Sequence, residues 1–264
     1  MGAIYNIAFA AYLLALLAGI MSLFWKRWRL GLVNIVFIGA GAAAQTVYMG
    51  LRWVEAGRAP FSNMFESLVL FSWSVAVIFL FLQKRTKLAA LGTFTAIMTV
   101  AVTACASAFF SSNIEPLVPA LRSNWLAFHV FSCFLGYGGF ALSAFAASIY
   151  LFGGRAGNEV YLESQETLER LVAKTISFGF LFLTLGIITG AVWANSAWGT
   201  YWSWDPKETW SLITWLIYAG YLHCRYMRGW RGGVTAWISL LGFVSVLFTY
   251  FGVNYLLKSL HSYA

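Results

Sequence analysis

The sequence contains few charged residues, few prolines and few cysteines, and each shortage excludes a class of protein. Charged residues make up 10% of the 264 residues, whereas 61% are hydrophobic and the mean hydropathy is +0.74. A soluble protein of this size could not bury so much apolar surface, so the bilayer must be its solvent. The four prolines fall between long apolar runs or where one begins, so none interrupts a predicted helix.

The shortage of cysteine excludes several kinds of redox and haem protein. Cys105, Cys133 and Cys224 are isolated, without a CxxC pair. A disulfide framework, a thiol–disulfide exchange motif and a covalent CxxCH haem site are therefore absent, and we interpret the three thiols as packing residues. The net charge of +8 resides in short loops between apolar runs, which indicates membrane topology and not nucleic-acid binding.

Apolar runs of roughly 18–25 residues predict about eight transmembrane helices. The predicted spans are residues 3–24, 31–52, 65–83, 88–110, 125–152, 173–193, 208–227 and 234–258. The basic cluster near residue 26 follows the first span instead of preceding it, as in a retained anchor. Without a repeat or low-complexity linker, residues 1–264 are expected to form one domain, an all-α polytopic membrane helical bundle.

The connection 153–174 is the longest on its side of the membrane. It contains ESQETLERLVAK (163–174), which predicts a short amphipathic helix at the membrane surface. Its glutamates and arginine are interpreted as a solvated face without a chemical role.

The distribution of lysine and arginine predicts the orientation. Alternate connections carry twelve of the 17 basic residues, namely Lys26, Arg27, Arg29, Lys84, Arg85, Lys87, Arg155, Arg170, Lys174, Arg225, Arg228 and Arg231. The opposite side carries only Arg52, Arg58, Arg122, Lys207 and Lys258. By the positive-inside rule the basic side is cytoplasmic, so both termini and the connection at about residues 194–209 are expected outside.

The three histidines lie near predicted membrane boundaries. His129 and His261 are expected at the outer side, and His223 toward the inner side. A single interfacial histidine is often only a polar anchor. Two on one side, flanking an aromatic-rich loop, favour a metal or haem site, because neutral imidazole is a common ligand of metals and of haem iron.

The stretch WGTYWSWDPKET (198–209) concentrates aromatic rings in one connection. The rings belong to Trp198, Tyr201, Trp202 and Trp204. They could form flat apolar walls for a porphyrin, with Arg58, Arg122 and Lys207 as a cationic rim for its propionates. The alternative is an aromatic belt at the bilayer interface. The density of tryptophan favours the platform over the belt.

Two short motifs predict helix starts. Asp205-Pro206-Lys207-Glu208 combines an N-cap, a proline at the first helical position and a carboxylate at the third. Asn63 and Glu66 in PFSNMFESL repeat the three-residue spacing. Capping is sufficient to explain both motifs. Their position on the outer side also makes all four polar residues candidates for contact with a ligand at the tryptophan loop.

The run WGxxWxWDxxET resembles the tryptophan-rich WWD signature of haem-handling proteins in cytochrome c maturation. Within that group the chain resembles the CcsA/ResC family of the System II pathway. The supporting stretches are PFSNMFESLVLFSW (60–73), NWLAFHV (124–130), WSLITWLIYAGYLHCR (210–225) and YFGVNYLLKSLHSYA (250–264). The first 59 residues match only as generic spanning helices. The related CcmC type is shorter and the CcmF type much longer.

The resemblance implies a set of site residues. His129 and His261 correspond to the two ligands of haem b at an outer site, and His223 to an intramembrane histidine. The cradle corresponds to Trp198, Gly199, Trp202, Trp204 and Asp205. The chain has no fourth histidine, so it cannot complete an inner bis-histidine site by itself. That gap predicts a partner, which in the family is the membrane protein CcsB (ResB).

The resemblance also implies a function. The protein is expected to accept haem near His223 and to present it outside between His129 and His261. There the thiols of a CxxCH motif in apocytochrome c add to the haem vinyl groups, in a haem-lyase complex of a bacterial cytoplasmic membrane or a thylakoid. The alternatives are a CcmC-type carrier without ligation activity, a b-type electron-transfer subunit, and a haem-free transporter.

Overall fold

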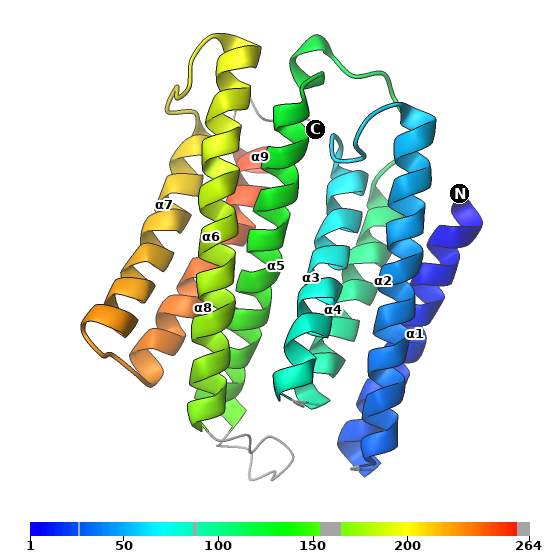
Figure 1. Cartoon of the computed structure of the whole chain (residues 1–264), viewed down its shortest axis with the longest axis vertical. Helices are drawn as coiled ribbons and strands as arrows, with labels where there is room; N and C mark the ends of the chain where they lie inside the picture. Colours follow the sequence, from blue (N-terminus) through cyan, green and yellow to red (C-terminus); the bar gives the residue numbers. More distant parts are fainter. Residues whose placement is uncertain (26, 87–88, 154–164, 258–264) are drawn as a thin grey trace. The chain divides into compact units, whose positions relative to one another are not determined.

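A computed structural model describes residues 1–25, 27–86, 89–153 and 165–257 (Figure 1). Every regular element in these ranges is helical, which confirms the predicted all-α class. The chain divides into two compact units, with unit 1 built from Met1–Ile114 and unit 2 from the described residues after Ile114. That the whole chain acts as one domain stays a prediction.

Seven helices are long and apolar enough to cross a membrane, so the chain is an integral membrane protein. They are α1 (Gly2–Trp25), α2 (Trp28–Ala56), α3 (Met64–Thr86), α4 (Ala89–Phe109), α5 (Asn124–Phe152), α6 (Gln165–Trp198) and the run from α8 (Gly233–Leu247) through the π-helix η5 (Phe248–Gly252) to α9 (Val253–Leu256).

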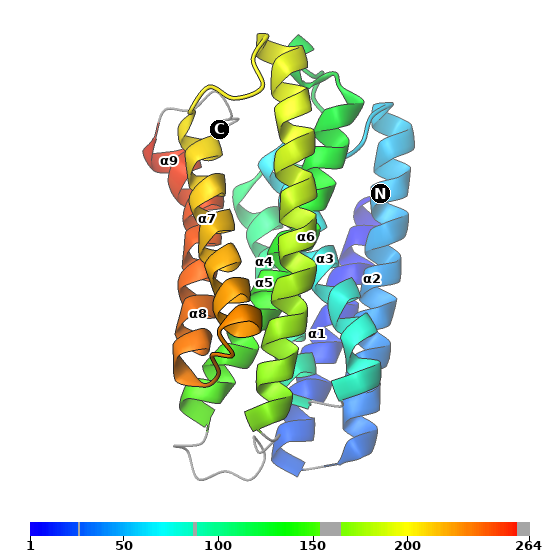
Figure 2. The ribbon, with the colours of Figure 1, turned by 60° about the vertical axis from the view of Figure 1, so that its left-hand side comes forward.

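The predicted span 208–227 is not among these seven. Its α-helical part, α7 (Pro206–Leu222), has 17 residues and is continued by the π-helix η4 (His223–Met227). A short 3₁₀ turn, η1 (Pro119–Leu121), precedes α5. Figures 1 and 2 show α7 returning along α6 and α8, so it carries the chain from one end of unit 2 to the other.

Unit 1 is a four-helix bundle joined by buried hydrogen bonds. The Tyr12 hydroxyl donates to Gln45 Oε1 at 2.6 Å, and Gln45 Nε2 donates to Ser72 Oγ at 2.6 Å. This chain of contacts joins α1, α2 and α3. Asn34 Nδ2 donates to the Ala15 carbonyl oxygen at 2.8 Å and reinforces the α1–α2 pair. In lipid such bonds contribute to helix association because burial alone does not distinguish a neighbouring helix from the hydrocarbon.

The pairing of α5 with α6 is the structural centre of unit 2. A methyl group placed on Gly136 of α5 would lie 3.0 Å from the Gly179 carbonyl oxygen of α6. The two backbones can approach this closely only because both positions lack side chains. The α5–α6 pair fixes the framework on which the outer histidine is placed.

The amphipathic segment expected at the membrane surface is instead part of α6 in its described residues. α6 begins at Gln165 and continues without a break to Trp198, and it contains no proline. Leu168 and Leu171 are buried, and Glu169 is largely buried against Arg225. The interpretation of the whole charged face as solvated was therefore wrong for Glu169.

Candidate functional site

The tryptophan-rich loop joins the end of α6 to the start of α7, at one end of unit 2 (Figure 2). Gly199 terminates α6 with a left-handed backbone, φ 79°, and its N–H donates to the Asn195 carbonyl oxygen at 2.9 Å. Glycine accepts this conformation without steric cost, which makes the chain turn directly after Trp198.

The start of α7 is capped as the sequence predicts. Asp205 is the N-cap, Pro206 is the first helical residue, and the Asp205 carboxylate accepts the Lys207 N–H at 3.0 Å. Glu208 reaches back and accepts the N–H groups of Asp205 at 3.2 Å and of Ser203 at 2.8 Å. The predicted capping arrangement is confirmed. Both carboxylates hold the end of the loop in place, and their contact with a ligand stays a prediction.

Two aromatic rings of the loop are exposed although the loop is anchored at both ends. Tyr201 is 60% exposed and Trp204 is 68% exposed, while Trp202 packs edge-to-face against Trp204 with ring centroids 5.8 Å apart. Trp204 also has a left-handed backbone, φ 59°. Non-glycine residues avoid this region, and such strain concentrates at functional sites.

His129 lies in the second turn of α5, at the same end of unit 2 as the loop. Its Nδ1 lies 2.7 Å from the Gly186 carbonyl oxygen of α6. A carbonyl oxygen can only accept, so Nδ1 carries the proton and donates it. In the neutral ring this leaves the Nε2 lone pair for coordination, the arrangement found in metal-binding histidines.

Trp193 of α6 supports the His129 ring from one side. The two rings stack with centroids 6.0 Å apart and an angle of 20° between their planes. Trp193 is 1% exposed, its indole N–H donates to the Ala120 carbonyl oxygen at 2.9 Å, and its ring packs edge-to-face on Trp198 at 4.8 Å. A continuous series of rings therefore leads from His129 to the first residue of the tryptophan motif.

Trp193 is a site residue that the sequence motifs do not include. It is the last residue of the predicted span 173–193, outside the WGTYWSWDPKET stretch, and no charged residue or histidine is next to it in the sequence. Its signal was topological: antiparallel helices bring the start of the fifth span beside the end of the sixth. The glycines Gly186 and Gly190, four residues apart on one face of α6, were a second signal, because small residues allow an adjacent helix to place a ring there.

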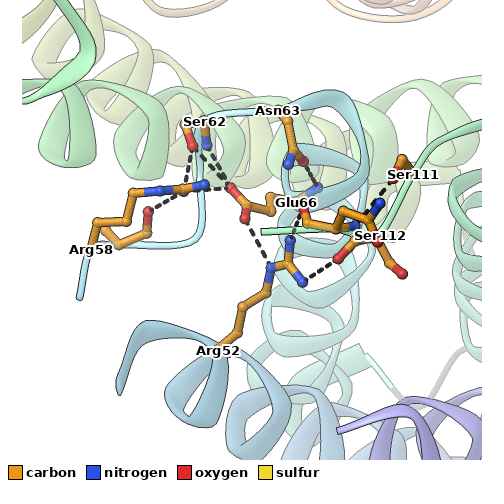
Figure 3. Close-up of polar contacts among 9 residues, drawn as sticks. Arg52, Arg58, Ser62, Asn63, Glu66, Ser111 and Ser112 are labelled. Carbon is orange, nitrogen blue, oxygen red and sulfur yellow. Dashed lines mark hydrogen bonds and ion pairs between the residues drawn. The ribbon is translucent and has the colours of Figure 1, made fainter. Parts of the chain in front are cut away.

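The second predicted motif, around Asn63 and Glu66, lies in unit 1 (Figure 3). Asn63 caps α3 as predicted, since its Oδ1 accepts the Glu66 N–H at 2.8 Å. The Glu66 carboxylate does not complete a capping box. It accepts from Arg52 Nε at 2.8 Å and from Arg58 Nη1 at 3.0 Å, and it also accepts the Ser62 N–H at 2.9 Å.

This buried network joins several segments of unit 1 (Figure 3). Arg52 also donates to the carbonyl oxygens of Ser112 at 2.7 Å and Asn113 at 3.1 Å. It therefore holds the residues after α4 against the ends of α2 and α3. Arg58, expected as a rim cation, is paired with Glu66. A role of Asn63, Glu66 and Arg58 beside the tryptophan loop stays a prediction.

The remaining predicted residues are two histidines and two rim cations. His223 is exposed at the first position of η4, at the opposite end of unit 2 from His129 (Figure 1). His261 lies outside the described residues. Of the predicted rim cations in unit 2, Arg122 is exposed and its Nε donates to the Leu117 carbonyl oxygen at 3.1 Å. Lys207 Nζ donates to Asn254 Oδ1 at 2.9 Å.

The described part of the site offers one oriented imidazole and a set of aromatic faces. Within the described ranges, no group of three or more histidine, cysteine, aspartate or glutamate side chains is placed to hold a metal ion. An imidazole with a fixed tautomer, stacked on one indole and near others, suits a planar ligand whose metal already has equatorial donors, as in a metalloporphyrin.

The chain is similar to known proteins of cytochrome c assembly. A family model described as Cytochrome C assembly protein matches residues 61–261. The chain is 38% identical over 288 residues to the cytochrome c biogenesis protein CcsA of Guillardia theta, covering 98% of this chain and 94% of the relative. It is 35% identical over 323 residues to CcsA of Gloeobacter violaceus, with shares of 98% and 94%.

A solved structure of the cytochrome c haem lyase CcmF has a similar fold. It superposes with a TM-score of 0.75 at 18% sequence identity, over 97% of this chain. The match covers 46% of CcmF, so this chain spans about half the length of that protein. At this identity the likeness is one of fold.

Proposed function

Because the chain belongs to the CcsA family of cytochrome c assembly proteins, we propose that it binds haem b in the membrane and presents it outside for covalent attachment to apocytochrome c. Haem is here the substrate, carried to the protein that will keep it. The proposal names His129 and His261 as its axial ligands at the outer site. Its cradle consists of Trp198, Gly199, Trp202, Trp204 and Asp205.

The observation that carries the proposal is the orientation of His129. Its Nδ1–H is committed to the Gly186 carbonyl oxygen, and its ring is stacked on buried Trp193. An interfacial polar anchor needs neither constraint. A ligand to iron benefits from both, because they fix the tautomer and hold the ring without rotation. The edge-to-face contact of Trp198 with Trp193 extends this series of rings toward the loop.

The chemistry of attachment requires positioning more than a protein nucleophile. Each CxxCH thiol adds across a haem vinyl group. The S–H bond and the vinyl π bond are replaced by one C–S and one C–H bond, so no external oxidant is needed. Holding haem and peptide in register converts a bimolecular encounter into a nearly unimolecular step. Axial imidazoles would also tune the reduction potential of the iron before the haem is attached to apocytochrome c.

The proposal includes a partner and an orientation. His223 is the only histidine at its end of the described part of unit 2, so we propose that a second axial histidine there comes from a CcsB/ResB-like membrane protein. Positive-inside topology supports placing the tryptophan loop and both termini outside, in a bacterial cytoplasmic membrane or a thylakoid.

The outer site is tested by replacing His129 with glycine in cells that contain the partner and an apocytochrome c. We expect holocytochrome c formation to fall by at least about 10-fold, because even the loss of a group that only orients a ligating histidine lowers metal affinity or activity by about that factor. Added imidazole should restore part of it by entering the space left by the side chain. Protein abundance in the membrane serves as the control, and full assembly without imidazole would refute the outer ligand.

A further inference from the structure

The backbone changes from α-helix to π-helix directly after α7, at the predicted haem-binding residue His223. His223 opens the π-helix η4, and its carbonyl oxygen accepts the N–H of Arg228 at 3.3 Å, five residues later. Single π-turns are rare and occur frequently at functional sites. The wider turn changes the directions in which the side chains of η4 point. The contacts that hold η4 in place therefore also determine the direction of the His223 side chain.

Glu169 of α6 holds η4 and the turn that follows it. One carboxylate oxygen accepts from Arg225 Nη1 at 2.9 Å, and the other accepts the Gly232 N–H at 2.7 Å. The side chains of Glu169 and Arg225 are only 12% and 10% exposed. A single glutamate thus gathers η4 and the residue just before α8, in surroundings where charge pairs are little screened.

A second contact supports the same docking. The Tyr226 hydroxyl lies 3.3 Å from Ser177 Oγ of α6. Arg225 and Tyr226 therefore both reach toward α6. Residues two apart on a helix point to nearly opposite sides, so holding Arg225 against α6 directs His223 away from it. His223 is accordingly exposed on the surface of unit 2.

We propose that Glu169 and Arg225 are positioning residues that hold His223 outward as a haem ligand, through the docking of η4 on α6. This rests on the proposed haem-handling function. Neither residue contacts the imidazole in the structure described, and both act through the backbone of η4. The class of ligand is the iron of a porphyrin shared between His223 and a donor from a partner.

The chain contains a matched control pair on the same helix. Glu166 and Arg170 of α6 form an ion pair at 3.4 Å, with side chains 64% and 59% exposed. Exposed pairs of this kind contribute little to stability. Glu166→Gln removes the same charge from the same helix as Glu169→Gln without touching η4.

The experiment uses the full chain, purified with its partner from haem-replete cells, in two backgrounds. The first retains His223, and the second carries His223→Gly with imidazole added, so that the ligand no longer depends on η4. In each background Glu169→Gln and Glu166→Gln are compared. The readouts are haem retained per chain and the fraction of low-spin ferric haem in the electron paramagnetic resonance spectrum.

Replacing a group that orients a ligating histidine costs about 10–100-fold in metal affinity. With His223 present, we therefore expect Glu169→Gln to lower retained haem severalfold and to reduce the low-spin fraction, while Glu166→Gln changes neither. In the His223→Gly background with imidazole, Glu169→Gln should have no further effect, because diffusible imidazole does not depend on the contacts of Glu169 with Arg225 and Gly232.

The other outcomes overturn the proposal in distinguishable ways. A loss of haem on Glu169→Gln in both backgrounds would assign the pair a structural role only. An unchanged spectrum in Glu169→Gln, while His223→Gly alone loses haem that imidazole restores, would refute the positioning role and leave the inner ligand intact. No effect of His223→Gly would remove the inner ligand from the proposed function, and this inference with it.

Discussion

At the scale of single residues, Trp204 distinguishes between two interpretations of the tryptophan loop, a ligand platform and an aromatic belt. Among the described residues it is the only non-glycine residue with positive φ, and its ring is 68% exposed. A tryptophan of an aromatic belt needs no strained backbone, since its position at the bilayer interface requires only exposure. The strained backbone therefore favours the interpretation that the Trp204 ring is oriented for contact with a ligand.

Trp204→Gly tests this interpretation. Glycine removes a left-handed cost of about 1–2 kcal/mol, while the lost edge-to-face contact with Trp202 is worth about 0.5–1.5 kcal/mol. Because these terms nearly cancel, we predict an almost unchanged thermal unfolding midpoint of the purified protein. Haem that co-purifies with the chain should decrease. Normal haem content at unchanged stability would favour the belt.

Some residue-scale features followed from the sequence and others required the structure. The cap at Asp205 and Glu208 was predictable because its determinants are adjacent in the chain. The pairing of Glu66 with Arg52 was not, because its partner belongs to another helix and competes with capping. The support of His129 by Trp193 also depends on which helices pack together.

At the scale of helices, the approach of α6 to α5 determines the position of His129. A methyl group on Gly190 would lie 2.5 Å from His129 Nδ1, closer than any packed side chain tolerates. Gly190 of α6 therefore leaves the space that the imidazole occupies. This dependence links the pairing of two helices to the orientation of one proposed ligand.

We predict that Gly190→Ala displaces the His129 ring and lowers holocytochrome c formation, though less than His129→Gly does. Gly220→Ala on α7 is the matched control, because nothing lies within 4 Å of the added methyl group. It should be neutral or slightly favourable to the helix. Equal activity of both variants, measured at equal membrane abundance, would show that His129 has room to move.

The predicted helices mostly agreed with the structure because apolar runs are long and uninterrupted. The differences arose at their ends. α6 extends back to Gln165, since the amphipathic segment continues the same helix. The predicted seventh span changes from α- to π-helix at His223, a local change that hydropathy does not detect. Helix boundaries are set by contacts with neighbours as much as by composition.

At the scale of the whole molecule, the two proposed haem positions lie at opposite ends of unit 2. His129 and the tryptophan loop lie at one end, and His223 lies at the other, together with the ion pair of Glu169 and Arg225. The separation suits a protein that receives its substrate at one side of the membrane and presents it at the other. The proposed partner rests on the number of histidines, which can be read from the sequence alone.

The central claim is that His129 and His261 bind one iron, and electron paramagnetic resonance of the purified ferric protein tests it most directly. The intact chain, isolated with its partner, should show a low-spin bis-imidazole signal from the outer site. His129→Gly and His261→Gly should each abolish that same signal and imidazole should restore it, while the double variant loses no more than either single one. Persistence of the signal in either single variant, or loss of two different signals, would contradict the account.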